Sequence, residues 1–257
     1  MTGFHMVPGS FGPPFAGRRA ILTGGSNGIG AAIAAELLGA GAELAILDLE
    51  PGQQHAERTV PVDLADRVAS GKAFDRAFRS LGGCDVLVNC AGISLPGNLK
   101  DLDPAHYEHV LAVNLHAPIW LMKTASVPMT EAGYGRIVNV TSIHARLSEP
   151  GSLAYDVSKA GLEAATRTAG VELASDGVLV NAVAPGFVST RMSFVEGRDE
   201  LQSGWFKEFY VRRRRLPLAR PGTPAEIARC VAWLASDLNT YMTGQVITAD
   251  GGLSARF

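Results

Sequence analysis

Short apolar runs alternate with longer helical patterns along most of the chain. Val, Ile and Leu dominate six of these runs, and each run predicts a strand: RRAILTGG, ELAILDLE, DVLVNCAG, GRIVNVTS, VLVNAVAPG and QVITADGG. A weaker strand is predicted at 60–62, where Pro61 counts against it. Near-continuous apolar strands are typical of a parallel sheet that helices cover on both faces.

The stretches between the strands carry helical periodicity. They predict helices at 28–41, 66–80, 103–130, 152–174 and 224–236. Pro118 and Pro128 are expected to bend or end the long third helix. Repeated strand–helix units imply right-handed crossovers, so the pattern predicts a single-domain Rossmann-like α/β fold, a doubly wound parallel sheet with helices on both faces.

The pattern fails at two places. Residues 1–17 are rich in Gly and Pro and predict a flexible N-terminal arm, which leaves residues 18–257 as the single domain. Residues 190–220 form the least regular segment inside that domain. A long irregular segment within a compact domain is often a lid or binding loop, so we expect a lid there.

Composition excludes several classes of protein. The net charge of −2 gives no support for binding nucleic acid or a membrane surface. No apolar run is long enough to span a bilayer, and the first residues lack a secretory signal. The three cysteines show no metal-binding spacing and fit reduced thiols, so we expect a cytoplasmic protein without a metal. The four arginines at 212–215 suit a solvated face.

A glycine-rich turn, TGGSNGIG, follows the first predicted strand and opens the first predicted helix. Gly24, Gly28 and Gly30 suit a tight turn that lets a pyrophosphate approach a helix N-terminus. Asp48 ends the second strand, where a carboxylate can accept hydrogen bonds from ribose hydroxyls and would repel a 2′-phosphate. No Arg or Lys lies at 25–27 or 49–50 to receive that phosphate, so the predicted cofactor is NAD rather than NADP.

The stretch YDVSK places Tyr155 and Lys159 four positions apart, on one face of a predicted helix. The spacing alone fits an ordinary helix surface as well as an acid–base pair. In the second reading, the ammonium would lower the pKa of the phenol from its usual value of about 10. Ser142, at the end of a strand, could then bond the same substrate oxygen.

These motifs, in this order, resemble the short-chain dehydrogenase/reductase family from about residue 18 onward. The resemblance rests on TGGSNGIG, NCAG at 89–92, Asn114, Ser142, Y-x-x-x-K and APGFVSTRM. It implies that Tyr155 is the general acid/base, that Lys159 lowers its pKa, that Ser142 orients the substrate oxygen and that Asn114 supports a proton relay. It also implies a homotetramer that assembles through the helices at 103–130 and 152–174.

The resemblance further implies a set of cofactor contacts. They are Gly24, Ser26, Asn27, Gly28, Ile29, Gly30, Asp48, Asp63, Leu64, Asn89, Ala91, Gly92, Tyr155, Lys159, Pro185, Gly186, Val188 and Thr190.

The substrate is the weakest part of the prediction. Candidate contacts are Ser94, His144, Phe187 and Trp205. The Ser-x-His arrangement of Ser142 and His144 is similar to family members that oxidise sugars, and imidazole suits a polyhydroxylated ligand, although a loop histidine bonded to backbone fits equally. We expect an NAD-dependent oxidoreductase acting on a secondary alcohol or carbonyl, with a sugar or polyol favoured. The alternatives are a 3-oxoacyl-thioester reductase and a non-catalytic NAD(H) sensor.

Overall fold

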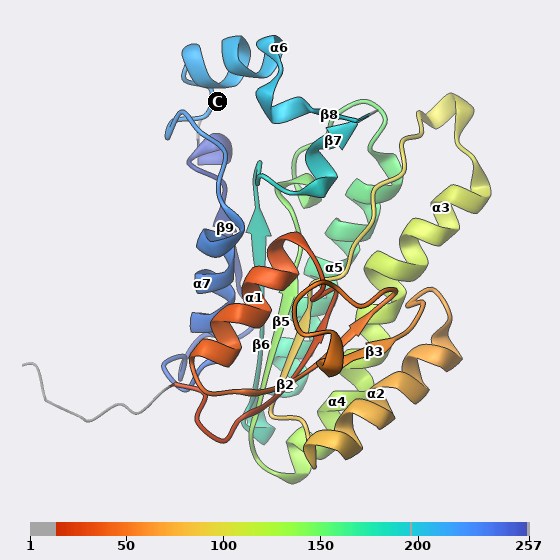
Figure 1. The fold of residues 1–257 in the computed structure, drawn as a ribbon, viewed down its shortest axis with the longest axis vertical. Coiled ribbons are helices and arrows are strands. Elements are labelled where there is room, and N and C mark those ends of the chain that lie inside the picture. The colour runs from red at the N-terminus through yellow and green to blue at the C-terminus, as the bar shows by residue number, and fades with distance from the viewer. Residues whose placement is uncertain (1–13, 196, 256–257) are drawn as a thin grey trace, which may run out of the picture.

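A computed structural model of the chain describes residues 14–195 and 197–255. Seven parallel strands form its central sheet, in the order β3-β2-β1-β4-β5-β6-β9 (Figure 1). Their bounds are β1 Arg19–Thr23, β2 Glu43–Asp48, β3 Thr59–Pro61, β4 Val86–Asn89, β5 Gly135–Val140, β6 Val178–Pro185 and β9 Val246–Ala249. This sheet confirms the predicted fold class.

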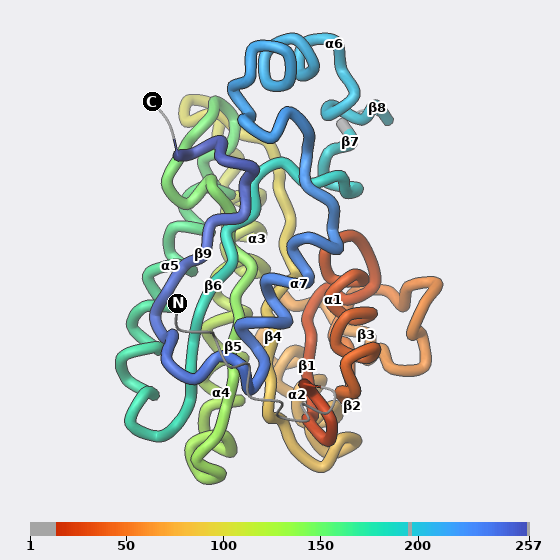
Figure 2. The backbone as a smooth tube through the Cα atoms, turned by 90° about the vertical axis from the view of Figure 1, so that its left-hand side faces the viewer, coloured from red at the N-terminus to blue at the C-terminus, as the bar shows by residue number. Residues whose placement is uncertain are grey.

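Helices cover both faces of the sheet (Figures 1 and 2). One face carries α1 (Gly28–Gly39) and α7 (Pro224–Ala235), and their core includes Ile33 and Val231. The other face carries α2 (Arg67–Leu81), α4 (Ala117–Glu131) and α5 (Leu153–Glu172), with Phe74 and Leu121 in its core. Burial on both sides explains why the central strands are apolar without alternation.

The long predicted helix is divided in an unexpected place. It comprises α3 (Pro104–Leu111), a π-helical turn (Ala112–His116) and α4. Pro118 directly follows the π-helical turn, in the first turn of α4, and Pro128 lies inside α4. The irregularity therefore precedes Pro118, and it contains the candidate residue Asn114.

Two boundaries differ from the prediction. Phe15 is 1% exposed in the core, and its N–H bonds the carbonyl of Ala40, so the expectation of an arm that runs to residue 17 is wrong at its end. The rest of that predicted arm, residues 1–13, lies outside the described residues. The weak strand at 60–62 exists as β3, which pairs with β2 alone at the sheet edge, where Pro61 removes no central hydrogen bond.

The predicted lid is more regular than its sequence suggests. It contains a short hairpin, β7 (Phe194–Val195) with β8 (Arg198–Asp199), then α6 (Gly204–Phe206) and a π-helical segment (Lys207–Arg212). Leu201, Phe206 and Leu216 form a small apolar core within it. The segment stands above the carboxyl end of β6, at the top of Figure 1.

The chain order of the strands reverses between β1 and β4. These neighbours pair in parallel, with Thr23 opposite Asn89. In open α/β sheets, the crevice at such a reversal is where ligands bind. The loops after β1 and β4 are the glycine turn and NCAG, so the topology places both predicted motifs at this crevice. Within the described part of the chain, no helix is both long and apolar enough to cross a membrane.

Candidate active site

The glycine turn packs tightly against the loop that follows β4. Gly24 has a left-handed φ of +69°, and a Cβ there would lie 2.6 Å from Cα of Ala91. A Cβ on Gly30 would overlap the carbonyl oxygen of Gly24. Side chains would therefore push the two loops apart, and only glycine allows this approach.

The N-terminus of α1 is suited to an anion. Asn27 caps α1 without a side-chain hydrogen bond, and the first turn holds no acidic residue. Backbone N–H groups and the positive end of the helix dipole are thus free to bind phosphate oxygens. Together with the side-chain-free floor at Gly28 and Gly30, this arrangement fits the pyrophosphate of a dinucleotide cofactor.

Asp48 is held at the end of β2 by backbone donors. Its carboxylate accepts hydrogen bonds from the N–H of Ser26 at 2.9 Å and of Leu49 at 2.8 Å. Ser26 Oγ donates to the carbonyl of Glu50 at 2.8 Å. These contacts fix an acidic group beside the glycine turn, on the side where an adenosine ribose would lie.

Thr23 joins the glycine turn to the loop after β4, a role that was not predicted from the sequence. Its Oγ1 accepts hydrogen bonds from the N–H groups of Cys90 at 3.0 Å and Ala91 at 3.1 Å. Thr23 could have been found from the sequence, because it is the first residue of the motif TGGSNGIG. Its role depends on the pairing of β1 with β4, which the linear motif does not display.

A buried amide network lies beneath NCAG. Asn89 Nδ2 donates to Asn139 Oδ1 at 2.9 Å, and Asn139 Nδ2 donates to Thr166 Oγ1 at 2.9 Å. Asn89 Oδ1 has no partner among the described residues. The network links β4 to β5 and α5, and Asn139 and Thr166 were not predicted from the sequence.

Asn114 is completely buried in the π-helical turn. Its Oδ1 accepts from the N–H of Ile93 and its Nδ2 donates to the carbonyl of Ile93, both at 2.8 Å. Nδ2 also lies 3.2 Å from Ser158 Oγ. A Cβ on Gly92 would lie 3.3 Å from Lys159 Nζ and 3.5 Å from Asn114 Oδ1, so Asn114 and Lys159 meet around this glycine.

Ser142, Tyr155 and Lys159 come together as predicted. Ser142 follows β5, while Tyr155 and Lys159 lie on one face of α5. Lys159 Nζ donates to the carbonyl of Val140 at 2.9 Å and lies 5.6 Å from the centre of the Tyr155 ring.

The electrostatics differ from the expectation that Lys159 lowers the pKa of Tyr155. Burial raises the pKa of the Tyr155 phenol above its usual value, a hydrogen bond with Ser142 opposes this, and the charge of Asp156 adds to it. Burial also lowers the pKa of Lys159 to about 8. A buried ammonium is itself costly, and this weakens Lys159 as a fixed positive charge.

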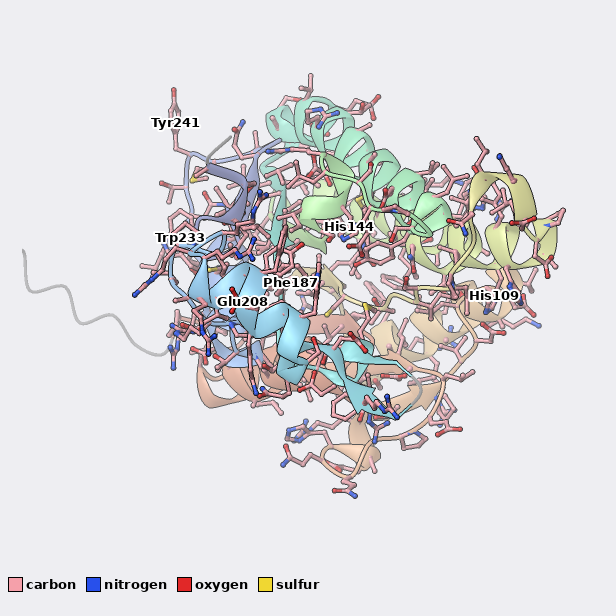
Figure 3. All side chains as sticks on the ribbon, turned by 90° about the horizontal axis from the view of Figure 1, so that it is seen from above. His109, His144, Phe187, Glu208, Trp233 and Tyr241 are labelled. Carbon is pink, nitrogen blue, oxygen red and sulfur yellow. The ribbon has the colours of Figure 1, made fainter. Side chains whose placement is uncertain are left out.

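His144 lies beside this group. Its backbone N–H donates to Ser142 Oγ at 3.2 Å, and its ring meets the Tyr155 ring edge-on at 5.5 Å between centroids. Its Nδ1 lies 2.7 Å from Asp156 Oδ1. Seen from the lid end in Figure 3, His144 and Phe187 lie near the middle of the molecule, whereas Trp233 and Tyr241 lie to one side.

The loop after β6 reaches back to the glycine turn. A Cβ on Gly28 would lie 3.4 Å from Thr190, so these two predicted cofactor residues are neighbours. Pro185 ends β6, and Gly186 and Val188 precede Thr190 on this loop. Beyond β3, Asp63 accepts from the N–H of Ala65 at 2.9 Å, and Leu64 is buried in the core. Ile29 packs against the core of α1.

The remaining substrate candidates are less closely gathered. Phe187 packs against Phe206 and Tyr210 of the lid, with ring centroids 5.0 and 4.7 Å away. Trp205 is 63% exposed and stacks on Phe209, so its contacts are with the lid rather than with Tyr155. Ser94 is exposed after NCAG.

The arginines at 212–215 are partly engaged within the lid. Arg212 and Arg213 pair with Glu208, and the guanidinium of Arg215 lies 4.6 Å from the centre of the Phe209 ring. Among the described residues, no group of three His, Cys, Asp or Glu side chains could hold a metal ion.

The chain is similar to known proteins over nearly its whole length. The family model described as enoyl-(acyl carrier protein) reductase matches residues 24–254. The chain is 34% identical to the 3-oxoacyl-[acyl-carrier-protein] reductase of Aquifex aeolicus (strain VF5), over 92% of this chain and 97% of that protein. It is 35% identical to the cis-4-hydroxycyclohexanecarboxylate dehydrogenase of Sinomonas cyclohexanicum, over 95% of this chain and 99% of that protein.

A solved structure from Beutenbergia cavernae is similar over almost its whole length. It is described as a putative NAD(P) dependent gluconate 5-dehydrogenase with NADP bound at low occupancy. The TM-score is 0.85, the identity is 32%, and the match covers 95% of this chain and all of that one. These similar proteins are thus named for quite different alcohols and ketones.

Proposed function

Because the chain belongs to the short-chain dehydrogenase/reductase family, we propose that it transfers a hydride between NAD and a secondary alcohol or its carbonyl, with a sugar or polyol as substrate. The broader activity follows from the family itself. The protein is an oxidoreductase of CH–OH and carbonyl groups that uses a nicotinamide cofactor.

Tyr155 is the proton-handling group of the proposed mechanism. Its phenol gives a proton to the carbonyl oxygen during reduction and takes one from the alcohol during oxidation. Ser142, whose interaction with the phenol opposes the rise in its pKa, would turn its one O–H to the same substrate oxygen and orient it. The nicotinamide cofactor, when bound, supplies the ring that accepts or returns the hydride, which no side chain can do.

Lys159 and Asn114 support Tyr155 from below. With a pKa of about 8, Lys159 can release and regain a proton near neutral pH, which suits a relay between the phenol and solvent. Asn114 fixes the loop after β4 through Ile93 and meets Lys159 at Gly92. Both polar atoms of the Asn114 side chain bond the backbone of Ile93, so its role is to hold the loop beside Lys159 in place.

Asp48 supports NAD over NADP. Its carboxylate is anchored by two backbone N–H groups at the end of β2, and Glu50 lies two residues further on. A 2′-phosphate there would meet negative charge. The bound NADP in the Beutenbergia cavernae structure belongs to that protein. The cofactor preference of this chain is tested by comparing its own rates with NAD and with NADP.

The observation that carries the substrate proposal is the position of His144. A largely buried imidazole, edge-on to Tyr155 and bonded to Asp156, puts a polar group beside the carbon that reacts. An apolar acyl chain would leave the second ring nitrogen, Nε2, without a partner, at the cost of its desolvation. A polyhydroxylated substrate offers it one.

A second candidate is reduction of a 3-oxoacyl thioester. The similarity to the 3-oxoacyl-[acyl-carrier-protein] reductase of Aquifex aeolicus favours it. The experiment is a panel in which the purified protein is offered NAD with aldoses, polyols and simple secondary alcohols, and NADH or NADPH with acetoacetyl thioesters. NADH formation from the hydroxylated substrates supports the proposal. Turnover of the thioester with NADPH alone contradicts it, and tight NADH binding without turnover favours a sensor.

We also propose that the protein is a cytoplasmic homotetramer. Its three cysteines are free, as in a reducing compartment. Trp120 and Val127 on α4, with Val157 and Val171 on α5, are large apolar side chains exposed on the helices expected to meet. Light scattering that gives the mass of one chain in solution would refute the assembly.

A further inference from the structure

The imidazole of His144 is held by a carboxylate that lies on the same helix as Tyr155. Nδ1 of His144 is 2.7 Å from Asp156 Oδ1, and both side chains are largely buried, with 19% and 14% of their area exposed. Asp156 directly follows Tyr155 in the first turns of α5. The turn that carries Ser142 and His144 is therefore fastened to the catalytic helix through this pair.

A carboxylate at this distance determines which ring nitrogen carries the proton. Ionised Asp156 is only an acceptor, so Nδ1 must donate. In the neutral ring, Nε2 is then an acceptor. Nε2 makes no hydrogen bond within the part of the chain that the structure describes. Glu149 Oε1 is 3.7 Å away, beyond hydrogen-bonding distance, on a side chain that is 58% exposed.

We propose that Asp156 is a positioning residue that fixes His144 with Nε2 as a hydrogen-bond acceptor for a hydroxyl on the carbon next to the reacting one, so that the substrate is a vicinal diol or an α-hydroxy ketone. This proposal rests on the proposed function and narrows it. The edge-on contact between the His144 and Tyr155 rings is its geometric basis, because a group beside the phenol faces the neighbour of the reacting carbon.

The same geometry selects against the competing substrate class. A 3-oxoacyl thioester carries a methylene group next to its ketone, and a methylene donates no hydrogen bond. An acceptor that a substrate desolvates without offering it a donor disfavours that substrate. His144 held by Asp156 would thus favour substrates with a hydroxyl on the carbon next to the reacting one, independently of Tyr155.

The test compares two matched alcohols, butane-2,3-diol and butan-2-ol, which differ by one hydroxyl. The full-length protein with NAD should prefer the diol in kcat/KM by about tenfold, the worth of one hydrogen bond. His144→Ala and Asp156→Ala should bring that ratio close to one. Asp156→Asn, whose amide oxygen can still accept from Nδ1, should retain most of it. Glu149→Gln is the control and should leave the ratio unchanged.

The ratio is the informative quantity because any effect of Asp156 on the phenol is common to both alcohols. A wild-type ratio near one, or a ratio that survives Asp156→Ala, overturns the proposal while leaving the dehydrogenase activity intact. A second readout does not need turnover. The ¹⁵N NMR signals of His144, assigned by their loss in His144→Ala, should show a protonated Nδ1 and a bare Nε2 in the wild type, with that state lost in Asp156→Ala. The opposite tautomer overturns the proposal even if no alcohol is oxidised.

Discussion

Replacing Lys159 by methionine should make the folded protein more stable at neutral pH while abolishing activity. Lys159 is 3% exposed, and burial lowers its pKa from 10.5 to about 8. A lysine with a lower pKa in the folded chain binds fewer protons there than in the unfolded chain. Its charge therefore opposes folding below pH 8, and this penalty disappears as the pH rises from 8 to 10.5.

The magnitude follows from the two pKa values. At about 1.4 kcal/mol per pH unit, the penalty below pH 8 is about 3 kcal/mol. Methionine removes this penalty but leaves the Val140 carbonyl, which now accepts from Nζ at 2.9 Å, without a donor, at a cost of about 1 kcal/mol. Lys159→Met should thus be about 2 kcal/mol more stable than wild type at pH 7, and slightly less stable at pH 10.5.

The assay is denaturant unfolding of both proteins at several pH values from 7 to 10.5, without added cofactor. Groups that titrate equally in both proteins cancel in the difference. Lys72→Met, at an exposed position on α2, is the matched control, and its difference from wild type should stay flat with pH. A Lys159→Met variant that is less stable than wild type at pH 7, or a difference that does not change with pH, would refute the reasoning.

Three further predictions concern the cofactor and the proton. Asp48→Asn should lower the ratio of kcat/KM with NAD to kcat/KM with NADP by about 100-fold, because it removes the charge facing a 2′-phosphate and weakens the hydrogen bonds to the ribose. An unchanged ratio in steady-state rates would exclude Asp48 as the residue that selects the cofactor. Gly30→Ala should abolish NADH binding measured by fluorescence, because the added Cβ would overlap the carbonyl oxygen of Gly24. Gly39→Ala has open space around the added Cβ, so it should keep NADH binding and raise the free energy of unfolding by about 0.5–1 kcal/mol. Because burial raises the pKa of Tyr155, oxidation, which needs the phenolate, should speed up with rising pH; a rate that is flat from pH 7 to 10 would contradict this.

The sequence predicted the sheet and its motifs well, for a physical reason. Strands buried on both faces are mostly apolar, so β1, β2, β4, β5 and β6 are visible as runs rich in Val, Ile and Leu. Glycine turns are equally visible, because only glycine fits where Gly24 meets Ala91. Both signals are local in the chain.

What could not be predicted depends on contacts between distant residues. Thr23 binds a loop 67 residues away, and Asp156 binds His144 across the gap between a strand end and a helix. The effect of burial on the pKa of Tyr155 and Lys159 likewise needs the packed site, whereas spacing suggested only their mutual attraction. The lid looked irregular because its helical segment, Gly204–Phe206 with Lys207–Arg212, is short, although Trp205 and Phe209 stack on it four residues apart.

The most direct test of the central claim is the rate of NADH formation from NAD and a polyol by the wild type, by Tyr155→Phe and by Tyr241→Phe. Tyr241 is 97% exposed and lies away from the site, so it is the matched control. We expect Tyr155→Phe to lose at least about 100-fold in kcat, the typical worth of a general acid–base group, and to bind NADH as the wild type does. Tyr241→Phe should keep its full rate. Equal rates for wild type and Tyr155→Phe would contradict the account.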